Sequence, residues 1–142
     1  MAQSILVRNS TDGKFKFLRG NSDGDAYVQL TGSYQQVDVT IAQNETVSTE
    51  IDFRNFKYLS FLMPADWDAA TITVRGSAAA GGTKVGIVSD AGVVFPAMTV
   101  AVDKIYSVDI HALKIVGVHY LALVASAAQT TAARTIKVML KA

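Results

Sequence analysis

The clearest strand pattern in the chain is Ile136-Lys137-Val138-Met139-Leu140-Lys141. Branched or apolar residues occupy every second position, and lysine or methionine stands between them. Successive side chains of a β-strand point to opposite faces, so this pattern is typical of a strand with one face on a core. The same alternation recurs in residues 37–41, 71–75 and 106–110. We therefore predict strands at all four places.

Two other segments are nearly continuous apolar runs, residues 56–63 and residues 120–125. Short runs with aromatic or branched residues favour strands that are covered on both faces in the middle of a sandwich. A buried helix is the alternative for the second run, although its length and its turn-forming neighbours favour a strand.

Short turns separate these segments. Glycine-containing pairs such as Asp12-Gly13, Asp23-Gly24 and Gly81-Gly82 supply the positive-φ positions that tight hairpins need. Residues 76–82 and 125–133 lack bulky side chains and are predicted to be flexible surface loops. About ten to twelve short strands at this spacing predict an all-β fold, an antiparallel, jelly-roll-like β-sandwich.

The domain organisation follows from a weak boundary near residues 31–33. Before it, residues 1–32 form an N-terminal β-arm or small subdomain with three expected strands, at 5–8, 14–18 and 26–30. After it, residues 33–142 form the sandwich. A three-strand piece buries little apolar area by itself, so it must dock on the sandwich or on another chain.

The candidate interaction residues are Phe15, Phe17 and Arg19. Phe15 and Phe17 alternate with Lys14 and Lys16, which makes one side of the predicted arm aromatic and the other basic. These aromatic residues either complete the chain's own core or reach a neighbouring subunit. The sequence leaves both interpretations open.

Composition excludes several classes of function. The 13 basic and 12 acidic residues nearly cancel and are interspersed, which argues against nucleic-acid binding by charge. The absence of cysteine excludes disulfides, thiol catalysis and thiolate metal sites. Neither a signal peptide nor a membrane span is expected, so we predict a soluble product of the cytoplasm.

Two constellations hold the available chemistry. Asp109 and His111 share a face if they share a strand, which begins a metal site only if His119 or another donor joins them. Asp66 and Asp68 flank Trp67, as acids beside a sugar platform would. The simpler interpretation is a polar strand end in the first case, and a loop that anchors Trp67 over the core with solvated acids in the second. We predict no enzymatic activity, no metal and no cofactor.

Residues 51–74 contain a strand ending in Met63-Pro64-Ala65, followed by Trp67, Ala70 and an Ile-Thr pair. Further along the chain come a Gly-Gly-Thr turn at 81–83 and a closing phrase, Gln129 to Ile136. With these motifs the chain resembles small structural proteins of tailed bacteriophages. It departs from their pattern at residues 76–80 and 117–119.

The resemblance implies a virion β-sandwich on the capsid surface, a head decoration (cement) protein. The implied partners are the major capsid protein and further copies of itself, as a homotrimer, with no small-molecule substrate, nucleic acid or membrane. Two alternatives stay open. One is a head–tail joining or tail protein, and the other is a carbohydrate-binding module that uses Trp67, Tyr34 or Tyr58 as its platform.

Overall fold

The structure is a computed structural model that describes residues 6–8, 15–17, 34–89, 91–108 and 118–142. The chain divides into two compact units, Met1–Gly32 and Ser33–Ala142. In the smaller unit, strand β1 (Leu6–Arg8) pairs antiparallel with β2 (Phe15–Phe17). The third strand expected there, at residues 26–30, lies outside the described residues.

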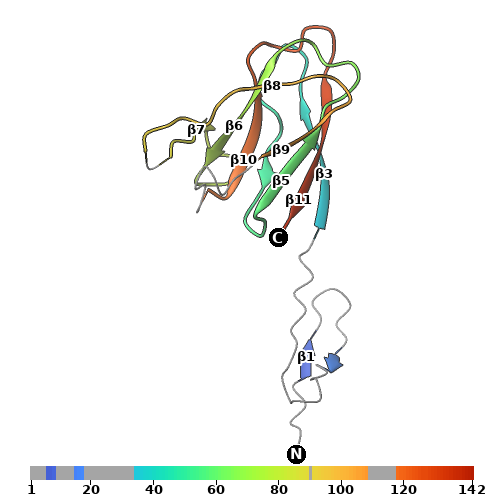
Figure 1. Ribbon diagram of the computed structural model, residues 1–142, viewed down its shortest axis with the longest axis vertical. Helices are drawn as coiled ribbons and strands as arrows, with labels where there is room; N and C mark the ends of the chain where they lie inside the picture. The colour runs from blue at the N-terminus through green and yellow to red at the C-terminus, as the bar shows by residue number, and fades with distance from the viewer. Residues whose placement is uncertain (1–5, 9–14, 18–33, 90, 109–117) are drawn as a thin grey trace, which may run out of the picture. The chain divides into compact units, whose positions relative to one another are not determined.

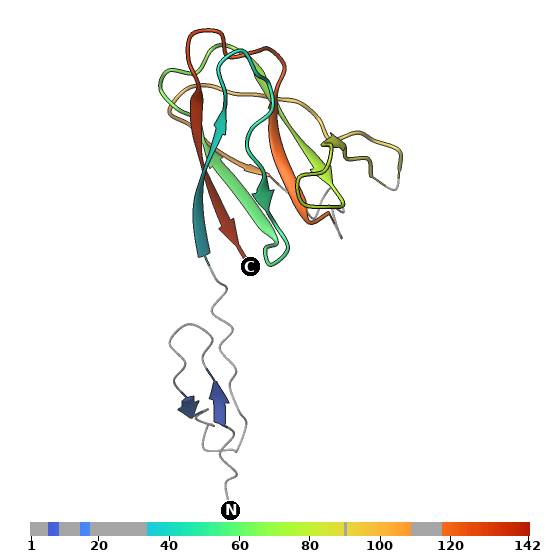
Figure 2. The ribbon, with the colours of Figure 1, turned by 180° about the vertical axis from the view of Figure 1, so that it is seen from behind.

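The larger unit is a sandwich of two antiparallel sheets (Figures 1 and 2). The first sheet has the order β3–β11–β5–β9, with bounds Tyr34–Ile41, Arg134–Lys141, Tyr58–Leu62 and Ile105–Val108. The second has the order β4–β10–β6–β7, with β8 also paired to β6; the bounds are Ile51–Asp52, Tyr120–Ala125, Thr71–Ser77, Val85–Gly86 and Met98–Thr99. No helix occurs among the described residues, so the predicted all-β antiparallel fold is confirmed.

The alternation in β11 sets the register of the first sheet. Ile136, Val138 and Leu140 are fully buried, and Val138 lies opposite Val37 on one side and Phe61 on the other. Because residues directly opposite share a face, one row of apolar side chains crosses three strands and enters the core. A slip of one residue would turn this row to solvent, so burial fixes the pairing.

The two apolar runs behave differently. β10 is buried from Leu121 to Ala125, which confirms a strand covered on both faces and excludes the helix alternative. The run at 56–63 becomes a strand only at Tyr58, and Tyr58 itself is half exposed. The prediction of full cover was wrong here because, among the described residues, no layer covers the outer face of this sheet at Tyr58.

The predicted flexible loops also need correction. Gly76 and Ser77 belong to β6 and are buried, and Ala125 belongs to β10. Gln129, in the middle of the second low-complexity stretch, is completely buried. Small residues here allow close packing. A Cβ added to Gly76 would lie 2.4 Å from Val118 Cγ1, so the glycine makes room for a neighbour.

Candidate protein-interaction site

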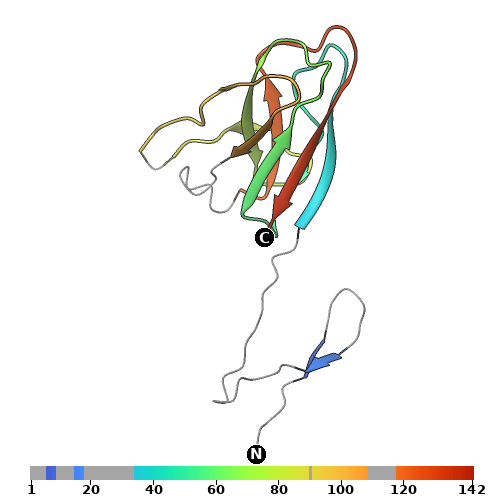
Figure 3. The ribbon, with the colours of Figure 1, turned by 45° about the vertical axis from the view of Figure 1, so that its right-hand side comes forward.

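A β-hairpin begins at β7, and the part beyond β7 extends away from the sheet to which β7 belongs (Figures 1 and 3). Its two sides are joined by Ser89 N–H donating to Val93 O at 2.8 Å and Phe95 N–H donating to Ile87 O at 2.8 Å. Val88 and Val94 face each other in the bridge between them. The turn includes Gly92 at φ 76°, a conformation that glycine adopts without strain. We call residues 85–95 the valine hairpin.

The valine hairpin presents apolar side chains to solvent. The exposed fractions are 60% for Val85, 54% for Val88 and 58% for both Val93 and Val94. One exposed valine needs no explanation, but four on a single hairpin give this projection an unusually apolar surface. Exposed apolar surface of this kind is common where proteins bind other macromolecules.

One residue anchors this hairpin to the core. Phe95 is buried, with 6% of its surface exposed, and Ile87 opposite it is half-buried. Alternation therefore places Val88 and Val94 on the face that points away from the core. A hollow of about 270 Å³ lies at the base of the hairpin, where Ile87 and Val118 meet Gly76. The hairpin is thus anchored at its base by Phe95 and exposes Val88 and Val94 on its outer face.

The sequence analysis missed this site, although the sequence carried a signal for it. Residues 85–102 contain seven valines and isoleucines but only one charged residue, Asp90. With a single charged residue, this run has no alternation of polar positions that would mark one face as solvated. The pattern therefore does not show which of its apolar residues are buried. Only the folded arrangement shows which of them stay exposed.

The residues predicted to interact are placed as follows. Phe15 and Phe17 lie in β2, where Phe17 pairs with Leu6, while Arg19 lies outside the described residues. Their contacts in a partner stay a prediction.

Of the three candidate metal ligands, only His119 is among the described residues, and it is exposed. Asp109 and His111 lie outside the described residues. Among the residues that are described, no group of three or more His, Cys, Asp or Glu side chains could hold a metal ion. Nor does that part of the chain contain a helix long and apolar enough to cross a membrane.

Hydrogen bonds and ion pairs join the Asp66-Trp67-Asp68 loop to Gln129, Thr131 and Arg134, and we call this group of residues the lock. Trp67 is buried, as the simpler interpretation held, and its indole N–H donates to Ala70 O at 3.2 Å. The acids are not merely solvated, which corrects the prediction. Arg134, of which only 5% is exposed, donates to Asp66 Oδ2 at 2.6 Å and to Asp68 Oδ1 at 3.1 Å.

Gln129 completes this lock. Its side-chain Oε1 accepts the backbone N–H of Asp68 at 3.2 Å, and its own backbone holds Asn44 and Glu45. Thr131 donates to Asp68 through its backbone N–H and its hydroxyl, at 3.3 and 3.2 Å. These bonds, first that of the Thr131 backbone and then those of Arg134, lower the pKa of Asp68 below its ordinary value.

Two further carboxylates have lowered pKa values. Hydrogen bonds from Arg54 lower the pKa of Asp52 to about 2, and the Lys84 ammonium, at 2.6 Å, lowers that of Glu50. A general acid for catalysis near neutral pH needs a raised pKa, so these groups and Asp68 have the wrong sign for that role. They serve as acceptors in ion pairs.

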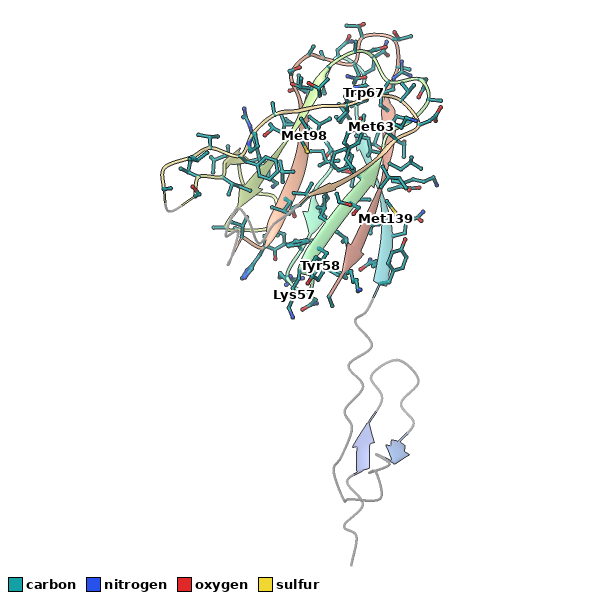
Figure 4. All side chains as sticks on the ribbon, viewed as in Figure 1. Lys57, Tyr58, Met63, Trp67, Met98 and Met139 are labelled. Atoms are coloured by element: carbon teal, nitrogen blue, oxygen red, sulfur yellow. The ribbon has the colours of Figure 1, made fainter. Side chains whose placement is uncertain are left out.

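The proposed sugar platforms separate in the structure. Trp67 cannot serve as a platform because it is buried in the core, near the end of the sandwich opposite Tyr58 (Figure 4). Tyr34 and Tyr58 are exposed by 63% and 50%, and Lys141 stands between them in register. A hollow of about 260 Å³ lies beside both tyrosines and extends to Ile105.

Comparison with known proteins adds one likeness. No family model and no curated protein matches the chain. A solved structure described as the crystal structure of the SPBc2 prophage-derived protein YomS resembles it, with 13% identity and a TM-score of 0.48. The match covers 78% of this chain and 96% of that one.

Proposed function

We propose that this chain is a non-enzymatic structural protein of a tailed-phage virion, and specifically a decoration protein of the capsid. The valine hairpin carries the proposal, because it is an anchored projection whose outer surface is apolar. The sequence resemblance of residues 51–136 supplies the virion context. The partner is the major capsid protein, and the location is the outside of the head.

The physical basis is burial of the hairpin's valines against the capsid. Each fully buried Val side chain contributes about 1.5–3 kcal/mol relative to exposure, before the entropy cost of association. A hairpin held by Phe95 loses little further freedom on binding, which favours affinity. Many copies on a symmetric lattice would together resist expansion of the shell, and we expect them to cluster as trimers at threefold positions.

The decisive experiment is a binding assay with purified heads. A double variant, Val88→Asp with Val94→Asp, places two charges on the outer face of the hairpin and should abolish co-sedimentation with the heads. The matched control is Val102→Asp, which changes an exposed valine outside the hairpin. Equal binding by the double variant and the control would show that the hairpin does not contact the capsid.

Copy number separates the decoration role from a head–tail joining or tail role. On the order of hundreds of copies per particle indicate the shell, whereas about six or twelve indicate a connector with cyclic symmetry. Quantitative mass spectrometry of purified virions gives this number.

Carbohydrate binding is the second candidate, now carried by Tyr34 and Tyr58 rather than by Trp67. The observation in its favour is that two exposed aromatic residues flank Lys141 over a shallow hollow. Glycan-array binding that disappears in Tyr34→Ala, with an unchanged melting temperature, would favour this function over the decoration role.

A further inference from the structure

The two sheets leave an opening along one side of the sandwich. β3 is the edge strand of one sheet and β4 is the edge strand of the other. Between them lies a cleft of about 490 Å³, whose apolar wall comes from Val37, Val39, Ile51, Phe56 and Leu140. We call this the edge cleft.

The strand that borders the edge cleft has unpaired backbone groups. Thr40 turns its N–H and C=O outward, where both bond to Thr49. Because the N–H and C=O groups of successive residues point to alternate sides of a strand, those of Gln36 and Asp38 also point outward. Among the described residues these groups have no partner. A free edge of this kind is a template for an added strand.

The rim of the edge cleft is acidic. Asp38, Glu50 and Asp52 line it, and none of the described basic residues does. Glu50 and Asp52 each hold a cation at 2.6 Å outside the cleft. Asp38 faces Lys137 only at 4.0 Å, with both side chains more than half exposed, so Asp38 is the carboxylate most open to a second cation.

A strand that fits this cleft must alternate apolar and basic residues. The chain's own segment 14–19, Lys-Phe-Lys-Phe-Leu-Arg, has this pattern. It contains β2, whose single described partner is β1. A two-stranded hairpin is marginal by itself, so it gains stability from a third strand. Two phenylalanines supply apolar bulk for the cleft, and the lysines and arginine supply charge for its rim.

We propose that β2 of one copy adds to the edge of β3 in a second copy, with segment 14–19 covering that copy's edge cleft. The contact is heterologous, because cleft and segment are different surfaces, so repetition builds a closed ring when the rotation between copies closes and an open filament when it does not. The connection of residues 18–33 spans up to about 50 Å when extended, which is enough to reach a neighbour. This inference concerns contacts between copies and does not depend on the capsid role.

Single cysteines test the contact, since the natural chain has none. One tagged copy carries Lys16→Cys, and a second, differently tagged copy carries Asp38→Cys. After mixing and mild oxidation, we expect at least about tenfold more disulfide-linked heterodimer than with the control Glu45→Cys, an exposed acid outside the cleft. Equal yields with Asp38→Cys and Glu45→Cys would overturn the proposal.

Two further measurements make the result unambiguous. A chain that carries both Lys16→Cys and Asp38→Cys should give linked oligomers; a disulfide confined to monomers would overturn exchange between copies. Asp38→Lys should weaken self-association in sedimentation by about tenfold, and Lys16→Glu in the same chain should restore it. Loss of head binding in the Val88→Asp, Val94→Asp variant has no bearing on these outcomes, so the two proposals fail separately.

Discussion

Two regions depart from the usual burial of apolar residues and exposure of polar ones. They are the valine hairpin and the lock around Arg134, and they depart from it in opposite ways. In the lock, an arginine and a glutamine are buried, while in the hairpin four valines are exposed. Burying a charge is costly unless it is paired and hydrogen-bonded, and Arg134 is paired with two carboxylates. Exposing a valine costs the folded chain little, because the unfolded chain exposes it as well. The buried pairs of the lock therefore serve folding, whereas folding does not account for the exposed valines of the hairpin, and for this reason we propose a partner for them.

The lock also contains residues of the motifs in which the sequence resembles phage structural proteins. The Asp66-Trp67-Asp68 loop is distant in sequence from Gln129 and Arg134, but Asp68 bonds to both of them. Gln129 Nε2 and Arg134 Nε are buried without a partner, which is the residual cost of packing polar groups there. These residues hold two loops of the sandwich together.

The largest expected effect is at the aromatic centre of the lock. Trp67→Ala should lower the free energy of unfolding by about 4 kcal/mol, because it removes a buried ring and leaves a cavity. Denaturant unfolding measures this change. Tyr34→Ala, at an exposed aromatic residue, is the control and should change the value by less than about 0.5 kcal/mol. If both changes were equally small, Trp67 would not be a core residue.

Removing the charge of the lock comes next. Arg134→Ala should cost about 3 kcal/mol, since it leaves Asp66 and the half-buried Asp68 facing each other without a cation. The exposed Arg75 gives the matched control, Arg75→Ala, with an effect near zero. A loss for Arg134→Ala no greater than that of the control in thermal melts would contradict the lock.

Acid should weaken the lock in a defined direction. The pKa of Asp68 is lower in the folded state, so its contribution is complete above the ordinary pKa of about 4 and is lost as pH falls through the lowered value. Melting temperatures should therefore decline between about pH 5 and pH 2. Asp68→Asn should melt lower at pH 7 and decline less steeply.

Asp52 provides the comparison for this titration. Its pKa is about 2 in the folded state, so it also contributes to the decline, but its pair with Arg54 is exposed. Salt at about 0.5 M should screen that exposed contribution more than the part due to Asp68. Melts of Asp52→Asn and Asp68→Asn with and without salt separate the two. An equal response to salt would contradict the assignment of Asp68 to a shielded pair.

The smallest effect is expected in the hairpin. Val88→Ser with Val94→Ser should change the free energy of unfolding by no more than about 0.5 kcal/mol, because both side chains are already more than half exposed. Calorimetry of the isolated protein measures this. A loss of several kcal/mol would mean that the hairpin supports the fold, and the contrast with the lock would disappear.

The fold class and most of the strands could be predicted from the pattern of apolar and polar residues. Ile136, Val138 and Leu140 could be assigned to a core because a period of two admits only one buried face. The run at 120–125 was identified as a doubly covered strand by its lack of polar residues. The run at 56–63 was not separable from it, since cover on the second face depends on a layer that local pattern does not specify.

Only the packing of the whole fold shows which polar residues are buried and which apolar residues are exposed. Nothing in the composition of residues 125–133 indicates that Gln129 is buried, because its partners, Asp68 and Asn44, are far away in the chain. In the same way, residue type does not distinguish the exposed valines of residues 85–94 from the valines of the core. Burial is a property of the whole packing, and local sequence records only which residues tolerate it.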